Sequence, residues 1–281
     1  MKKLFLFPAA FILLLIFTAA CVVAQTVPDA DILSSTRRNE QFIRRKGIQV
    51  RQVTVDVGAQ RFVINVFTKK GKKTQTFIVV HDSEDAAFDA GLRAIKHGGT
   101  FIALENHEGR PLYFYGADSG ATRQDPNRMF NTDNPYWPVA KKILELLDGS
   151  PDRMIFALHN NKPGGNFRID TIATWKNISI LSDADKDKRS LVWIPSSQPQ
   201  PNKKLADEIA FYKKKGLNVV YEYVPENERG DGSLSVYSAK HGIPYRNIEV
   251  EAGIRGNRRS ELKSRHRQMR YLRIVRNYLG I

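Results

Sequence analysis

Cysteine is nearly missing from this sequence. Of the 281 residues only Cys21 is a cysteine, so the chain cannot close a disulfide on itself. A site built from several cysteine thiolates, as in structural zinc domains, is excluded in the same way. If residue 21 is lost on maturation, no thiolate remains for catalysis. Any metal site must then be built from histidine and carboxylate side chains.

Long apolar runs are also scarce, and the one that stands out lies at the start of the chain. Lys2-Lys3 precedes an apolar run over residues 4–17, and small residues follow as far as Ala24. The run is short for a membrane span and has no charged far flank, which is typical of a cleaved export signal. We therefore predict a signal peptide over residues 1–24 and export of residues 25–281 to the periplasm or out of the cell.

Cys21 suggests a second processing route. Thr18-Ala19-Ala20-Cys21 loosely resembles a bacterial lipoprotein box, with Thr18 where a leucine is usual. This interpretation makes the mature chain a lipoprotein that is anchored through Cys21.

Acidic residues are too few to balance the basic ones. The chain has 44 Lys and Arg against 29 Asp and Glu, a formal net charge of +15, which falls to +13 without Lys2 and Lys3 of the predicted leader. This excess favours an anionic neighbourhood such as a cell envelope, anionic lipid or nucleic acid. The sequence shows no aromatic-basic motif of a known nucleic-acid reader, which argues against nucleic acid as the partner.

The residues after the leader predict one α/β domain. Alternating and β-branched runs favour strands, and runs with a helical period favour helices. Residues 25–47 are expected to form an extended lead-in and 116–133 a long irregular segment. With no internal repeat or linker, we predict a mixed, mostly parallel central β-sheet flanked by helices. The expected strands are 50–57, 61–67, 76–81, 100–104, 112–115, 154–158, 191–194, 219–224 and 245–251, and the expected helices are 85–97, 138–147, 203–215 and 260–279.

Two of the predicted strands lead into a histidine. Ile78-Val79-Val80 precedes His81, Glu84 follows three residues later where a helical pattern begins, and residues 154–158 precede His159. Strand ends that point into a crevice are where open α/β sheets keep their chemistry. Two imidazoles and a carboxylate can bind one metal ion and leave a fourth position for water, as in catalytic zinc sites.

Two further segments carry groups that suit such a metal. Asn127-Arg128 lies in a predicted loop, and an arginine beside an asparagine can hold a carboxylate through its guanidinium fork. Glu249 and Glu251 lie two residues apart on one face of a predicted strand. Either could be the general base for a metal-bound water, and the spacing leaves the choice open.

The order of these motifs resembles the zinc carboxypeptidase superfamily, which includes the succinylglutamate desuccinylase and aspartoacylase branch. His81-Asp82-Ser83-Glu84 looks like its first motif. Asp125-Pro126-Asn127-Arg128-Met129-Phe130 and Leu158-His159-Asn160 look like two motifs of the acylase branch. The run from Gly232-Ser233 to Glu251 is similar to the carboxypeptidase run of Gly-Ser, Tyr, Gly-Ile-x-Tyr and a strand Glu. The resemblance covers residues 77–253.

The resemblance implies a role for each of these residues. His81, Glu84 and His159 would bind one Zn²⁺ per chain, and Asn127 and Arg128 would hold the terminal carboxylate of the substrate. Glu251 would be the base, because Glu251-Ala252-Gly253 looks like the Glu-x-Gly of the acylases. Counting from Gly242-Ile243 in the carboxypeptidase pattern falls between Glu249 and Glu251, so Glu249 stays an alternative. The oxyanion-stabilising arginine has no clean match, and Arg123 is the nearest candidate.

The resemblance also implies a function, an exported zinc-dependent amide hydrolase. Because export disfavours cytosolic catabolism, we expect a carboxypeptidase or amidase that acts on peptidoglycan stem peptides or other carboxylate-bearing peptides. One alternative is an N-acyl amino acid deacylase. Another is a non-enzymatic envelope-binding protein that keeps the fold without the metal chemistry. The basic helix expected within residues 258–281 is either a docking helix or a face for an anionic envelope surface.

Overall fold

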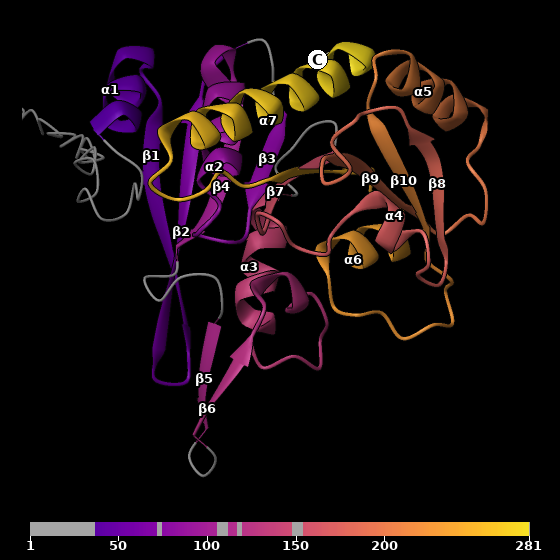
Figure 1. The fold of residues 1–281 in the computed structure, drawn as a ribbon. Helices are drawn as coiled ribbons and strands as arrows, with labels where there is room; N and C mark the ends of the chain where they lie inside the picture. Colours follow the sequence, from indigo (N-terminus) through magenta and orange to yellow (C-terminus); the bar gives the residue numbers. More distant parts are fainter. Residues whose placement is uncertain (1–36, 72–74, 106–111, 117–119, 148–153, 281) are drawn as a thin grey trace, which may run out of the picture.

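A nine-stranded sheet forms the centre of the molecule (Figure 1). The computed structural model describes residues 37–71, 75–105, 112–116, 120–147 and 154–280, so the predicted leader and Cys21 lie outside the described residues. The strands are β1 (Gln49–Val57), β2 (Gln60–Lys69), β3 (Thr76–Val79), β4 (Gly99–Glu105), β5 (Leu112–Gly116), β6 (Gly120–Gln124), β7 (Ile155–Asn161), β8 (Ile178–Asp183), β9 (Leu191–Ser196), β10 (Asn218–Tyr223) and β11 (Tyr245–Glu251).

The sheet is mixed, as predicted. Its order is β1-β2-β4-β3-β7-β11-β9-β10-β8, and β5 and β6 form a separate two-stranded sheet. Parallel pairs join β4, β3, β7 and β11 in the centre, and β9 pairs in parallel with β10. The other four neighbours are antiparallel. Parallel pairing is thus concentrated where the candidate site lies.

Helices cover both faces of the sheet (Figure 1). One layer contains α1, α2, α5 and α7, whose apolar residues share one core cluster. The other contains α3 and α6, which pack into a second cluster, and α4 covers a third. The helices are α1 (Arg37–Lys46), α2 (Asp85–Ala94), α3 (Trp137–Leu147), α4 (Ile169–Ile172), α5 (Lys203–Lys214), α6 (Leu234–Lys240) and α7 (Arg258–Leu279), with short 3₁₀ turns η2 (Ile95–His97) and η3 (Pro126–Arg128).

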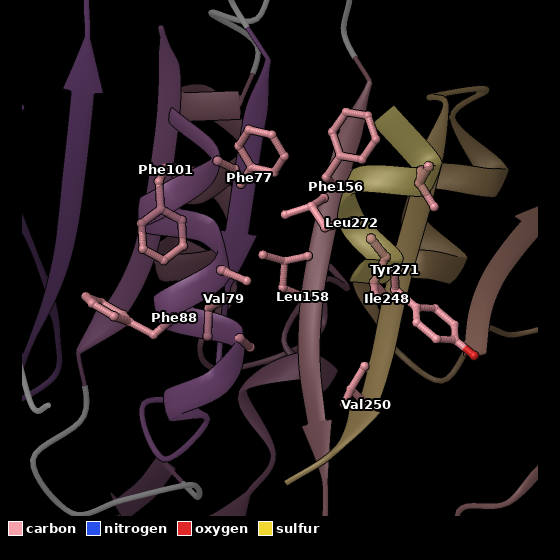
Figure 2. Close-up of a cluster of buried hydrophobic side chains, with 14 of the residues drawn as sticks. Phe77, Val79, Phe88, Phe101, Phe156, Leu158, Ile248, Val250, Tyr271 and Leu272 are labelled. Carbon is pink, nitrogen blue, oxygen red and sulfur yellow. The ribbon is translucent and has the colours of Figure 1, made fainter. Parts of the chain in front are cut away.

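The central strands are apolar on both faces because both are covered. Figure 2 shows Phe156 and Leu158 of β7 packed toward the α2–α7 layer, near Leu272 of α7. The alternate residues Ile155 and Ala157 belong to the opposite cluster. With both faces buried, polar side chains gather where the strands end.

Five elements differ from the sequence prediction, namely α1, β6, α4, β8 and α6. The expected lead-in contains helix α1, which buries Phe42 and Ile43 against the sheet. Strand β6 occupies part of the segment expected to be irregular, and strand β8 and helices α4 and α6 were not predicted. These short or strongly basic segments owe their structure to tertiary burial, which overrides weak local patterns. Among the described residues no helix has the length and apolar content that a membrane span needs.

Candidate metal centre

The three candidate ligands lie at the carboxyl ends of two neighbouring strands. β3 and β7 pair in parallel, so both end at the same edge of the sheet, where open α/β sheets bind ligands. His81 follows β3 by two residues, and His159 is the fifth residue of β7. Glu84 is the N-cap residue of α2. The turn from β3 into α2 therefore brings a carboxylate back toward both imidazoles.

The ligand atoms converge on one point. His81 Nδ1 lies 2.8 Å from Glu84 Oε1 and 3.1 Å from His159 Nδ1. His159 Nδ1 lies 3.2 Å from Glu84 Oε2. Ligand atoms around a tetrahedral zinc lie about 3.3 Å apart, since Zn–N distances are about 2.0–2.1 Å. The spacing, the donor types and the burial of all three side chains fit a divalent metal ion.

The electrostatics of the cluster also suit a cation. Burial opposes the ionisation of Glu84, but positive charge on the rings of His81 and His159 and their hydrogen bonds outweigh it, and they hold the pKa of the Glu84 carboxyl well below its usual range. The carboxylate is thus kept in the charged form that binds a metal.

Asp125 holds His81 from the other side of the ring. His81 Nε2 lies 2.7 Å from Asp125 Oδ1, which also accepts the backbone N–H of Asn127 at 2.8 Å. A carboxylate at Nε2 keeps the proton on that nitrogen and leaves the Nδ1 lone pair for a metal. Sequence analysis gave Asp125 no role. The signal was present, because a carboxylate opens the motif that carries Asn127 and Arg128.

The Asn127-Arg128 turn is anchored by the loop that precedes α6. Asn127 Oδ1 accepts the N–H of Leu234 at 3.2 Å, and the N–H of Phe130 donates to the carbonyl of Gly232 at 2.8 Å. Gly232 has a φ of +76°, and a Cβ there would lie 2.5 Å from the Arg128 carbonyl oxygen. Only glycine fits this close approach.

The guanidinium of Arg128 lies at the edge of a cavity. Its side chain is 44% exposed, its Nε is 3.4 Å from Asp231 Oδ2, and its Nη1 donates to the Asn127 carbonyl at 3.0 Å. The cavity has a volume of about 310 Å³, and Arg128, Asn131, Asn134, Arg229 and Asp231 are among the residues that line it. An anionic ligand can therefore reach the guanidinium.

Glu249 lies next to the ligands. It is the register partner of His159 in the parallel pair of β7 and β11. Burial raises the pKa of the Glu249 carboxyl, the charge on His159 lowers it, and the negative charge of Glu84 raises it again. These influences place Glu249 within electrostatic reach of the cluster.

Glu251 faces a different part of the chain. It pairs with Asn161, two positions beyond His159. Its Oε1 accepts the N–H of Gly164 at 2.8 Å and lies 3.5 Å from Arg189 Nη1. The structure therefore places Glu251 at the loop that follows β7.

Arg123 lies in the two-stranded sheet, where it pairs with Tyr113 across β5 and β6. Its side chain is outside the described part of the chain. Its role as oxyanion arginine therefore stays a prediction.

Comparison with known proteins gives similar solved structures but no matching family model or curated protein. A candidate metallopeptidase from Shewanella denitrificans has a TM-score of 0.46 at 12% identity, over 85% of this chain and 87% of that one. A metallo-carboxypeptidase from Burkholderia cenocepacia has the same TM-score and identity, over 86% of this chain and 69% of the other.

A third solved structure is the metallo-carboxypeptidase of Pseudomonas aeruginosa in complex with (2-guanidinoethylmercapto)succinic acid. It has a TM-score of 0.46 at 9% identity, and the match covers 86% of this chain and 68% of that one. Similarity of this extent carries no function from one protein to another, so the function is argued below from the residues of this chain.

Proposed function

We propose that this protein is a zinc-dependent amide hydrolase that cleaves a bond next to a free carboxylate. The observation that supports this most strongly is the convergence of two imidazole Nδ1 atoms and one carboxylate, with the His81 ring held by Asp125. His81, Glu84 and His159 would hold the ion. When bound, zinc supplies a Lewis acid that polarises a carbonyl and lowers the pKa of water.

In this proposal Glu249 carries the proton. A general base works best with a pKa near the operating pH, and burial raises the pKa of Glu249 in that direction. Its register beside His159 puts the carboxylate within reach of a water at the ligands, whereas Glu251 is engaged with Gly164. Glu249 would take a proton from the attacking water and give it to the leaving amine. We therefore favour the alternative base that the sequence left open.

Arg128 and Asn127 would bind the substrate carboxylate. The guanidinium offers a fork of N–H donors at the edge of the cavity, and the Asn127 side chain still has its amide N–H₂ after accepting from Leu234. A C-terminal peptide bond and an N-acyl amino acid both present such a carboxylate. Given the predicted export, we propose peptides of the cell wall, the peptidoglycan stem peptides, as substrates.

The zinc content of purified residues 25–281 tests this proposal. We expect about one zinc per chain in the parent, and loss of zinc in His81→Ala and His159→Ala. His266→Ala is the matched control, because this exposed histidine lies on α7 away from the cluster. The control should keep both the zinc and the hydrolysis of acylated dipeptides with a free C-terminus.

Two results would contradict the proposal. The first is a parent chain that binds no zinc after reconstitution near neutral pH. The second is a zinc-loaded parent that cleaves neither acylated dipeptides nor muropeptides. The first would favour the non-enzymatic envelope-binding alternative.

A further inference from the structure

Glu222 of β10 is a largely buried carboxylate that the proposed mechanism does not use. Its Oε2 accepts the indole N–H of Trp193 at 2.7 Å. Burial raises the pKa of Glu222, and the hydrogen bond from Trp193 opposes that rise. Within the described residues no Lys, Arg or His nitrogen lies within 4.0 Å of it. Because buried carboxylates in proteins are usually paired with a cation, this one lacks its usual partner.

Glu222 lies on the same face of the sheet as the proposed base. Asn247, two residues before Glu249 on β11, is the register partner of Trp193 on β9. Trp193 pairs in turn with Val220 of β10, and Glu222 is two residues further along that strand. Since alternate residues of a strand share a face, Glu249, Asn247, Trp193 and Glu222 point to one side.

Glu222 and Arg128 line two cavities that share residues 229–231 as part of their walls. Glu222 and Asp231 line a cavity of about 200 Å³, and Asp231 and Arg128 line the cavity of about 310 Å³ described above. Arg128 and Asp231 are also close enough for their charges to act on the Glu222 carboxyl. A residue whose carboxylate is held at Arg128 can therefore direct its side chain toward Glu222.

The side chains of Trp193 and Ser235 are hydrogen-bond partners of Glu222, but no cation is paired with it among the described residues. Asn247 Oδ1 is buried and has no hydrogen-bond partner in the described part of the chain, while the Asn247 N–H₂ donates to Glu249 at 3.0 Å. The basic residues that line the smaller cavity, Lys176 and Arg229, are 79% and 83% exposed and reach outward to Glu228 and Asp133. An ammonium group brings three N–H donors and a positive charge, which is what this face lacks.

We propose that Glu222 is a specificity-determining residue that selects substrates with a cationic side chain on the residue whose carboxylate Arg128 holds. Glu222 supplies the charge, and Asp231 strengthens the negative potential at the shared wall of the two cavities. The proposal rests on the proposed function, because it takes Arg128 as the carboxylate anchor. It narrows the substrate class to peptides that end in an amine-bearing residue, such as a diamino acid of a cell-wall stem peptide.

Binding measured apart from turnover tests this proposal. The probes are Nα-acetyl-lysine and Nα-acetyl-norleucine, which share the carboxylate and the chain length and differ in the terminal ammonium. We expect calorimetric titration of the zinc-loaded protein to show that Nα-acetyl-lysine binds about 30-fold more tightly than Nα-acetyl-norleucine. This is the fold-change expected for a buried charge pair. Glu222→Gln should remove this preference and leave norleucine binding unchanged, because glutamine keeps the acceptor for Trp193.

Glu228→Gln is the matched control. Glu228 borders the same cavity but already pairs with Lys176 and Asn177, so its replacement should leave the preference intact. Glu222→Asp, which keeps the charge, should retain part of the preference.

The outcomes separate this proposal from the proposed function. Equal binding of the two ligands to the parent, or a lysine preference that survives Glu222→Gln, would overturn the role of Glu222 even if peptides are hydrolysed. A lysine preference that depends on Glu222, in a zinc-loaded protein that cleaves neither acylated dipeptides nor muropeptides, would support the binding role and contradict the hydrolase.

Discussion

Strand β11 carries a complete polar network on one face and an incomplete one on the other. On the face toward α5, Arg246 donates to both oxygens of Glu208 at 2.6 Å and to the Tyr245 carbonyl at 2.7 Å. Tyr212 adds a third bond to Glu208 at 2.6 Å. Every charge there has its partner within the chain. Such a network needs no ligand and fixes how α5 packs on the sheet.

The opposite face of β11 carries buried polar groups that lack a hydrogen-bond partner among the described residues. These groups are Asn247 Oδ1 and the Tyr245 hydroxyl. Glu249 carries a raised pKa caused by burial, and the two imidazoles and the carboxylate of the candidate metal centre lie beside it. A polar cluster whose groups all bond to one another (the closed face of β11) stabilises the fold. A cluster that leaves buried polar groups without a partner (the open face) has groups available for a ligand.

The largest expected effect concerns the proposed base on the open face. Glu249→Gln should lower kcat by about 10²- to 10⁴-fold, because glutamine cannot accept the proton from water. Zinc content should not change, since Glu249 is not a proposed ligand. Glu251→Gln is the matched control and should lower kcat by about threefold at most, because Glu251 binds Gly164 away from the ligands. Steady-state kinetics on one acylated dipeptide decides between them, and the reverse ranking would return the role to Glu251.

The next effect concerns the closed face of β11, where Arg246 pairs with Glu208. Glu208→Ala should destabilise the protein by about 3–5 kcal/mol, because it leaves the buried guanidinium of Arg246 without its carboxylate. Zinc content of the folded fraction should stay that of the parent. Denaturant unfolding measures the change, with exposed Glu226→Ala as the control. A loss below about 1 kcal/mol would show that the network contributes little to stability.

Local pattern was sufficient to predict which side chains meet at the candidate metal centre. Apolar β-branched runs before His81 and His159 predict strands that end there, and parallel neighbours bring such ends together. The choice between Glu249 and Glu251 could not be made in this way. It depends on the register between β7 and β11, which joins segments far apart in the chain and is fixed only by tertiary packing.

The same limit explains what the sequence left out. Helix α1 is rich in Arg and has little apolar content, so its pattern is weak until Phe42 and Ile43 are seen buried in the core. Glu222 reads as an ordinary strand carboxylate, and only its neighbours Trp193 and Arg128 distinguish it. Burial and charge environment are properties of the assembled sheet, not of a sequence window.

A smaller effect is expected at Asp125, which holds the His81 ring of the candidate metal centre. Asp125→Asn should weaken zinc binding by about 10- to 100-fold, because an amide no longer fixes the proton on His81 Nε2 as a carboxylate does. Competition with a chelator measures the affinity. Asp133→Asn, an exposed carboxylate in the same loop region, should leave it unchanged. Equal affinities in the Asp125 variant and the parent would show that His81 is oriented without Asp125.

The smallest effect comes from a matched pair of buried tyrosines, one on each side of the comparison. Tyr212→Phe removes a hydroxyl that donates to Glu208, and should cost about 1 kcal/mol of unfolding free energy, because Glu208 keeps both bonds from Arg246. Tyr245→Phe removes a hydroxyl without a partner among the described residues, and should be neutral or stabilise by up to about 1 kcal/mol. Denaturant unfolding of the zinc-free proteins measures the contribution of each hydroxyl to the unfolding free energy without a contribution from metal binding. If Tyr245→Phe costs as much as Tyr212→Phe, the Tyr245 hydroxyl is bonded in solution, and the open face is more complete than the structure shows.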